Sequence, residues 1–275
     1  MFQSSITSPT RLAILDIETA APATEDDSFP PWPTHRPVVA SVLTAERQRY
    51  GQWRFALESV TFDADAAGAI ERVGQLIERH TVVGFNSRGF DLPVLALEAC
   101  RTQRFGCAGL SLAWRANRFT GSHIDLLDSV SSFGGARGAS LQMLCEQLGI
   151  PVKTSTHGSD VGELMAAGEV GKVIAYCEED VAATLCLAAN LLALRYDEPT
   201  YAGLVSQFGT WVRERELAHL APFERLAGSA EFDRLSLNGI LDEGLAALDY
   251  RMHLRWTTNV PGATGLTDAA FSDND

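Results

Sequence analysis

Acidic side chains follow a predicted buried strand near the start of the chain. Asp16 and Glu18 end the apolar run at residues 11–17, which is typical of a buried strand. Two residues apart on a strand, their side chains share one face of the sheet. A carboxylate pair that emerges from a buried strand needs a compensating cation. The pair is a candidate metal site, although Asp63 and Asp65 have the same spacing without a preceding apolar run.

Two further stretches carry polar groups next to apolar elements. In GFNSRGFDLPVL, Asn86 follows a predicted strand and Asp91 begins the next helix. Asp91 could serve as a helix cap and Asn86 as a turn residue. In YCEEDVAATLCL, Tyr176 and Asp180 are four residues apart and share one face of a predicted long helix. Tyr176 could be a core residue, and we expect Glu178 to be solvated on another face.

Taken together, these stretches favour a site for two metal ions. Asp16, Glu18, Asp91 and Asp180 are all expected at strand ends, or on helices beside them, near one edge of a sheet. Four carboxylates that face one another repel unless they are neutralised. Two divalent hard cations would supply that charge and prefer oxygen ligands. A pair of such ions roughly 4 Å apart stabilises the attacking and leaving oxygens in phosphodiester hydrolysis.

A mixed α/β sheet flanked by helices must position these groups. Hydrophobic periodicity predicts the following strands: 11–17, 38–43, 52–59, 81–85 and 123–127. It predicts the following helices: 65–80, 91–104, 141–148, 161–167 and 170–195. Residues 20–37 contain five prolines and are expected to form a long loop.

The chain is predicted to have three parts. Residues 1–195 form the α/β domain, 196–256 a C-terminal helical extension interrupted at Pro222, and 257–275 a flexible acidic tail without basic residues. The 275 residues are 46% hydrophobic and 21% charged, which is typical of a globular protein rather than a disordered or fibrous one.

Composition also bears on the cellular context. No apolar run approaches the roughly 20 residues that span a bilayer, so we expect no membrane association, and the first residues do not resemble a secretory signal. The five cysteines form no CxxC pair and are typical of reduced thiols in a cytoplasmic protein. The net charge of −13 argues against unspecific coating of nucleic acid, but it does not exclude a local basic groove.

The window between Glu98 and Asp125 contains no acid and is a candidate for such a groove. It holds arginines interspersed with aromatic residues, namely Arg101, Arg104, Arg115 and Arg118 with Phe105, Trp114 and Phe119. This combination suits single-stranded nucleic acid, through phosphate contacts and base stacking. A solvated loop with core aromatic residues would have the same composition. Arg88 is a further candidate phosphate ligand.

Three motifs resemble those of the 3′–5′ exonucleases of the DEDD superfamily: DIET at 16–19, N-x4-D at 86–91 and Y-x3-D at 176–180. The resemblance covers roughly residues 11–195 and is strongest to the predicted exonucleases similar to the proofreading domain of family B DNA polymerases. HIDLLD near His123 and the stretch 153–161 also resemble that group. The resemblance implies a ribonuclease-H-like fold. Ala175 stands where one branch of the superfamily has histidine, and Tyr176 matches the tyrosine (DEDDy) branch.

The resemblance further implies roles for these residues. Asp16, Glu18, Asp91 and Asp180 would ligate two Mg²⁺ or Mn²⁺ ions. Tyr176 would orient the attacking water, because a phenol with a pKa of about 10 is a poor base at neutral pH. Thr19, Asn86 and Phe90 would place the terminal nucleotide, and Arg88, Arg115 and Arg118 would contact the strand.

The expected function is metal-dependent removal of nucleotides from single-stranded DNA or DNA 3′ ends, in a setting such as DNA repair. DNA is expected rather than RNA. Two alternatives remain open: an RNA-trimming exonuclease of the ribonuclease D kind, and a non-catalytic ribonuclease-H-like module that binds nucleic acid.

Overall fold

A five-stranded mixed sheet forms the centre of the protein in a computed structural model that describes residues 8–24, 28–117, 120–152, 161–196 and 200–228. Its strands are β1 (Arg11–Ala20), β2 (Arg36–Arg47), β3 (Trp53–Thr61), β4 (Thr81–Gly84) and β5 (His123–Asp125). They lie in the order β3-β2-β1-β4-β5. β1 runs antiparallel to β2 and parallel to β4, and β5 is parallel to β4. This arrangement confirms the predicted ribonuclease-H-like mixed sheet.

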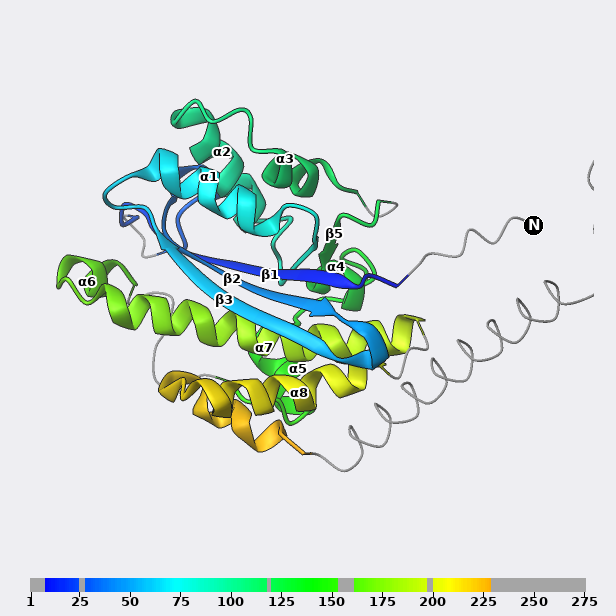
Figure 1. The fold of residues 1–275 in the computed structure, drawn as a ribbon. Coiled ribbons are helices and arrows are strands. Elements are labelled where there is room, and N and C mark those ends of the chain that lie inside the picture. The colour runs from blue at the N-terminus through cyan, green and yellow to red at the C-terminus, as the bar shows by residue number, and fades with distance from the viewer. Residues whose placement is uncertain (1–7, 25–27, 118–119, 153–160, 197–199, 229–275) are drawn as a thin grey trace, which may run out of the picture.

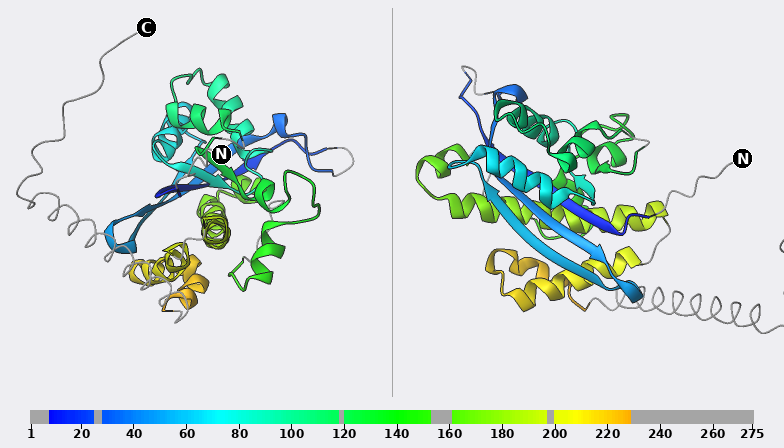
Figure 2. Two further views of the ribbon diagram at one scale, coloured as in Figure 1. Left: turned by 90° about the vertical axis from the view of Figure 1, so that its right-hand side faces the viewer. Right: turned by 45° about the horizontal axis from the view of Figure 1, so that its top comes forward.

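Helices cover both faces of the sheet (Figures 1 and 2). One face is covered by α1 (Ala66–Ile77), α2 (Asp91–Arg101) and α3 (Ala108–Arg115). The other is covered mainly by α7 (Val170–Tyr196) and α8 (Thr200–Arg215). The shorter helices are α4 (Leu126–Val130), α5 (Leu141–Gln147), α6 (Val161–Ala166) and the 3₁₀ turns η1 (Trp32–Thr34), η2 (Arg49–Gly51) and η4 (Ala218–Leu226).

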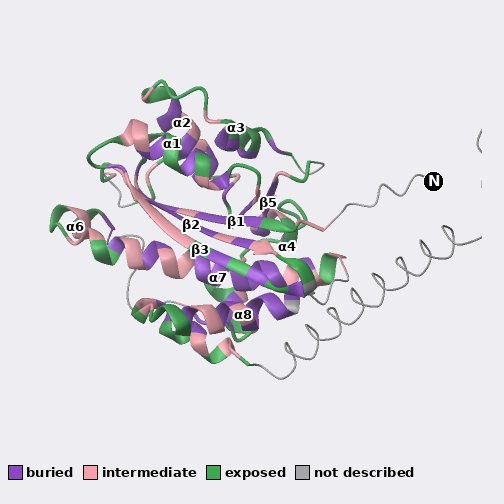
Figure 3. Ribbon diagram, in the orientation of Figure 1, coloured by how far each residue is buried: buried purple, intermediate pink, exposed green. Residues whose placement is uncertain are grey.

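The side chains of β1 alternate between two cores, as expected for a central strand. Leu12 and Ile14 pack in the core beneath α7, whereas Ala13, Leu15 and Ile17 pack in the core beneath α1 and α2. Figure 3 shows β1 and β2 as largely buried. Because of this alternation, the side chains of the next even-numbered residues of β1, Asp16 and Glu18, point toward α7.

The long helix α7 lies between the sheet and α8 (Figure 1). Its buried residues therefore surround much of its circumference, among them Val181, Leu185 and Leu192. The predicted helix over 170–195 is confirmed to within one residue at its end. Because both sides of α7 are packed, side chains on more than one face can take part in buried contacts.

The elements differ from the sequence predictions in several places. The strand predicted over 123–127 ends at Asp125, and Leu126 begins α4. β1 continues to Ala20, with an irregularity in its pairing between Glu18 and Thr19, so the carboxylates lie within the strand. The proline-rich loop contains the 3₁₀ turn η1, and its last proline, Pro37, already belongs to β2. α3 was not predicted, because it is a short helix within the arginine-rich window.

The described part of the C-terminal segment packs onto the same core as the sheet. Tyr201 and Phe208 of α8 and Phe223 of η4 are buried in the cluster that holds Leu12 and Leu185. Pro222 lies inside η4, where the predicted interruption occurs. The rest of the predicted helical extension, from 229 to 256, and the tail at 257–275 lie outside the described residues, so the predicted domain boundaries stay predictions. None of the described helices is long and apolar enough to cross a bilayer.

Candidate active site

Asp16 and Glu18 lie on the face of β1 that α7 covers. Glu18 is 8% exposed and Asp16 is half-buried. A carboxylate oxygen from each, together with the sulfur of Cys177 on α7, forms a group of atoms that all lie within 4.8 Å of one another. The first predicted acidic pair is therefore gathered at the contact between β1 and α7.

Asp91 lies at the first turn of α2. The N-cap position belongs to Phe90, so Asp91 is not the simple helix cap that its position allows. Its side chain instead reaches across to the sheet, where Oδ1 accepts a hydrogen bond at 3.1 Å from the main-chain N–H of Ile17. Ile17 stands between Asp16 and Glu18. The second motif is thus joined directly to the backbone of the first.

The turn that leads into α2 is held by a buried carboxylate. Asn86 has a φ of 59°, a left-handed conformation that asparagine tolerates better than most residues. Asp125, at the end of β5, accepts hydrogen bonds from the main-chain N–H groups of Asn86 at 3.0 Å and Arg88 at 2.8 Å. A Cβ at Gly84 would lie 2.5 Å from Cβ of Ser87, so only glycine permits this turn to fold so close to the strand. The described contacts give Asn86 a role in the turn.

Asp180 of α7 contributes charge to the same region. Burial, assisted by the charges of Asp125 and Asp180, raises the pKa of Asp91 to about 7, against hydrogen bonds from the N–H groups of Asp91 itself and Ile17. Tyr176, one turn before Asp180, is 7% exposed and packs with Cys177 and Val39. The structure therefore gathers the predicted acids and the tyrosine from β1, α2 and α7 around one part of the sheet.

Cys177 is a component of this region that the sequence analysis treated only as a core thiol. Its Sγ lies 3.5 Å from Oδ2 of Asp16 and 3.4 Å from the main-chain oxygen of the same residue. Burial, followed by the charges of Asp16 and Glu18, raises the pKa of the thiol well above its ordinary value. Its position directly after Tyr176 in the third motif is the one sequence signal that could have identified it.

The donors suit hard divalent cations. Carboxylate oxygens predominate, which is the ligand type that Mg²⁺ and Mn²⁺ prefer. Burial raises the pKa of Asp91, and repulsion by the charges of Asp125 and Asp180 raises it further. A bound cation would relieve that repulsion, so the residues fit a divalent metal.

An aromatic cluster adjoins the carboxylates. The hydroxyl of Thr19 lies 2.7 Å from Nδ1 of His35. The His35 ring stacks on Phe29, with centroids 4.9 Å apart, and packs in a T-shaped arrangement with Phe90, with centroids 5.0 Å apart. Phe29 is 74% exposed. Thr19 and Phe90 were predicted to place the terminal nucleotide, whereas Phe29 and His35 were missed because they lie in the proline-rich loop.

Most of the predicted basic residues already have protein partners. Arg88 pairs with Asp128 at 2.9 Å and donates to the main-chain oxygen of Ala116, so the described contacts favour a structural role over the predicted phosphate contact. Arg101 pairs with Glu98 and Arg104 with Glu71. Arg115 is exposed at the end of α3, and Arg118 lies outside the described residues. Among the described arginines, Arg115 is therefore the best candidate for the predicted contact with a nucleic-acid strand.

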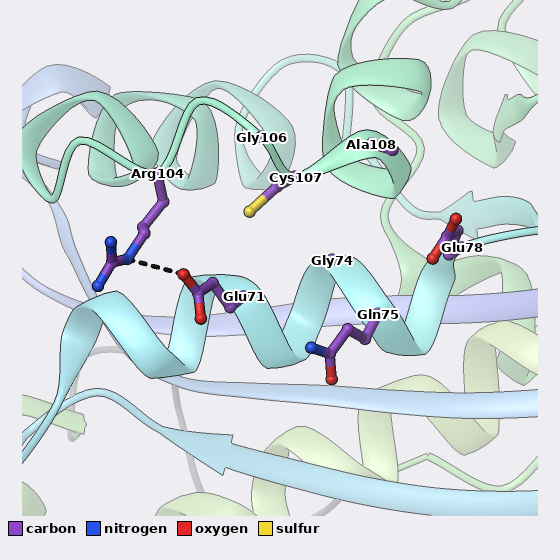
Figure 4. A pocket seen from close by; sticks show the side chains of 8 residues that line it. All are labelled: Glu71, Gly74, Gln75, Glu78, Arg104, Gly106, Cys107 and Ala108. Carbon is purple, nitrogen blue, oxygen red and sulfur yellow. Dashed lines mark ion pairs between the residues drawn. The ribbon is translucent and has the colours of Figure 1, made fainter.

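Two cavities lie outside the group of four predicted metal ligands. One, of about 340 Å³, is formed by α1 and the segment that leads into α3, and Figure 4 shows the Arg104–Glu71 ion pair at one end of it. None of the predicted site residues lines it. The other, of about 1070 Å³, is bounded by β5, α4 and the end of α7, and includes Arg88. Neither is lined by Asp16, Glu18, Asp91 or Asp180.

Comparison with known families gives one match. Residues 27–226 match the family described as predicted 3′–5′ exonuclease related to the exonuclease domain of PolB. The matched region contains Asp91, Tyr176 and Asp180 and begins after Asp16 and Glu18. The chain matches no curated protein.

Solved structures with some likeness include a family B DNA polymerase from the hyperthermophilic archaeon Pyrobaculum calidifontis, at 20% identity over 71% of this chain and 26% of that one, with a TM-score of 0.45. Product-bound exonuclease I is similar at 15% identity over 68% of this chain and 44% of that one, with a TM-score of 0.43. The chain thus spans less than half the length of either structure.

Proposed function

Because the chain belongs to the family of predicted 3′–5′ exonucleases related to the exonuclease domain of PolB, we propose that it removes nucleotides from the 3′ ends of single-stranded DNA in a reaction that requires divalent metal ions. One observation carries the proposal. Asp16 and Glu18 lie within one stretch of β1, Asp91 is bonded to the main chain between them, and the charge of Asp180 acts on Asp91. Repulsion between clustered carboxylates costs the fold stability, whereas a metal-dependent hydrolase needs these groups as ligands.

Asp16, Glu18, Asp91 and Asp180 would hold two Mg²⁺ or Mn²⁺ ions. When bound, such ions lower the pKa of water and neutralise charge on the phosphate. The chain's own residues set the geometry. The hydrogen bond from Ile17 fixes Asp91 against β1, and the contact with Cys177 fixes Asp16 against α7.

Tyr176 would orient the attacking water. It lies on α7 one helical turn before Asp180 and beside Cys177, so its ring is held by packing near the acids. A phenol with an ordinary pKa of about 10 keeps its proton at neutral pH and can donate or accept one hydrogen bond. We assign it positioning of the water rather than removal of its proton.

The aromatic cluster of Phe29, His35 and Phe90 would receive the terminal nucleotide. Thr19 directly follows Glu18 and Phe90 directly precedes Asp91, so the cluster is connected to both sides of the acidic site. An exposed ring such as Phe29 can stack on an unpaired base of any sequence. A terminal base within a duplex is already stacked and paired, so this arrangement favours single strands.

Hydrolysis of a 5′-labelled single-stranded oligonucleotide tests the proposal. With Mn²⁺ or Mg²⁺ we expect a ladder of products that shortens from the 3′ end and stops when EDTA is added. Asp16→Asn should be inactive and folded, whereas Asp63→Asn, which alters an exposed acid outside the site, should be active. Absence of metal-dependent hydrolysis of DNA would refute the proposal. Faster hydrolysis of RNA of the same sequence would assign the enzyme to RNA instead.

A further inference from the structure

A row of polar side chains crosses the sheet from the candidate site toward the C-terminal segment. Asp16 of β1 pairs in register with Ser41 of β2, and Ser41 pairs with Ser59 of β3. All three lie on the face covered by α7. Ser41 and Ser59 are an even number of residues from Leu43 and Phe55 on the same strands, and those two residues are buried in the core on that face. Polar residues at three successive cross-strand positions are unusual on a covered face of a sheet.

Hydrogen bonds join the members of the row. The hydroxyls of Ser41 and Ser59 lie 2.8 Å apart, and Ser59 donates to Oε1 of Glu178 on α7 at 2.7 Å. Because Ser59 has one hydroxyl proton and gives it to Glu178, Ser41 is the donor to Ser59. At the other end, Cys177 lies within hydrogen-bonding reach of Ser41 and contacts Oδ2 of Asp16.

The row ends on a residue of the C-terminal segment. Nε2 of His219 in η4 lies 2.6 Å from Oε2 of Glu178, in a close electrostatic contact rather than a well-aligned hydrogen bond. The side chain of Glu178 is only 13% exposed, so the sequence-based expectation that it is solvated was wrong. Its two oxygens connect β3 on one side with η4 on the other.

We propose that Ser41, Ser59, Glu178 and His219 are positioning residues. They would hold α7 and β1 in the relative position in which Asp16 can ligate a metal ion. This inference rests on the proposed function of the carboxylates. It gives the segment after α7 a part in metal binding, although His219 itself is not a ligand. Partners that orient metal ligands typically change metal affinity or activity by about 10- to 100-fold when they are removed.

A pair of matched substitutions at Ser59 isolates the hydroxyl. Ser59→Thr keeps it and Ser59→Val removes it, and the two new side chains have the same shape and suit a strand. In the full chain we expect Ser59→Val to weaken binding of Mn²⁺, measured by electron paramagnetic resonance, by about ten-fold. It should also lower kcat with little change in KM, whereas Ser59→Thr should match the wild type.

Two further variants complete the experiment. Thr44→Val removes a hydroxyl from β2 outside the row and should change neither quantity. His219→Ala, at a side chain 26% exposed, should repeat the effect of Ser59→Val on Mn²⁺ affinity while thermal unfolding stays close to that of the wild type. If Ser59→Val fails to fold, the Mn²⁺ affinity of His219→Ala decides whether the row supports metal binding.

Equal Mn²⁺ affinity in Ser59→Val and Ser59→Thr, or in His219→Ala and wild type, would overturn the inference. A wild-type protein that binds Mn²⁺ but hydrolyses no nucleic acid would instead refute the proposed function. In that case the comparison of Mn²⁺ affinities would still decide whether the row positions Asp16.

Discussion

The main-chain N–H of Ile17 donates a 3.1 Å hydrogen bond to Oδ1 of Asp91, which joins the middle of β1 to the start of α2. The bond fixes a buried carboxylate beside the residue that separates Asp16 from Glu18. Asp91 can ligate a cation well only when its carboxyl group is ionised. The packing of α2 against β1 therefore places Asp91 beside the acidic pair of β1.

Asp91→Asn should stabilise the protein in the absence of metal at neutral and higher pH. The folded pKa of Asp91, about 7, lies above the ordinary value of 3.8, so folding favours the protonated form. Its contribution to stability is fully present below the unfolded pKa and is lost as pH rises toward and through about 7. Asparagine keeps an oxygen to accept the bond from Ile17 and carries no charge.

Thermal unfolding in EDTA, followed from about pH 4 to about pH 8, checks this prediction. The melting temperature of the wild type should fall relative to that of Asp91→Asn as pH rises. Parallel curves across that range would show that Asp91 does not hold an unfavourable charge. Mn²⁺ should raise the melting temperature of the wild type at pH 8 and have less effect on the variant.

Tyr176→Phe should lower kcat by about a hundred-fold, which is within the range for groups that assist proton transfer or position the reacting water. The phenyl ring keeps the packing against Cys177 and Val39, so Mn²⁺ affinity should be preserved. Tyr201→Phe removes a phenol that bonds the main-chain oxygen of Pro9 and serves as the matched control. Steady-state hydrolysis of single-stranded DNA measures both, and a kcat for Tyr176→Phe equal to that of the wild type would remove this residue from the mechanism.

Phe29→Ala should raise KM for single-stranded DNA by roughly ten-fold, because stacking on an aromatic side chain contributes about 1–3 kcal/mol per base. The effect should disappear on an oligonucleotide whose 3′-terminal nucleotide lacks its base. An equal loss on both substrates would indicate a disturbed loop rather than lost stacking. Phe133→Ala, at an exposed ring outside both the aromatic cluster and the arginine-rich window, is the control.

Reversing the charge of Arg115 and Arg118 to glutamate should weaken DNA binding more at low salt than at high salt, because phosphate contacts release counterions. Arg213→Glu changes an exposed charge on α8, across the sheet from α3, and should have little effect. Fluorescence anisotropy with labelled DNA in Ca²⁺ follows binding. The same salt dependence in the double variant and wild type would contradict the assignment of the groove.

Much of the fold could be predicted because its main elements have strong local signals. The apolar run at the start of β1 and the apolar pattern of α7 identify both elements, and the three motifs locate Asp16, Asp91 and Asp180. The hydrogen bond from Ile17 to Asp91 could not be predicted, because it depends on how closely α2 approaches β1. Gly84 permits that approach.

Other features depended on packing that no local pattern reveals. Glu178 reads as a solvated residue on α7, yet the C-terminal segment packs beside α7 and places His219 against it. The sequence around Phe29 indicates only a proline-rich loop. The stacking of Phe29 on His35 depends on how the chain turns back into β2. The sequence predicts Arg101 as part of a basic groove for nucleic acid. In the structure it pairs with Glu98 and donates to the main-chain oxygen of Pro33 in that loop.

The location of bound manganese tests the central claim most directly. Anomalous scattering from crystals soaked with Mn²⁺ and a mononucleotide should show two peaks between β1, α2 and α7, each in contact with carboxylate oxygens from Asp16, Glu18, Asp91 or Asp180. Density for the nucleotide but no anomalous peak among these four residues, at saturating Mn²⁺, would contradict the account.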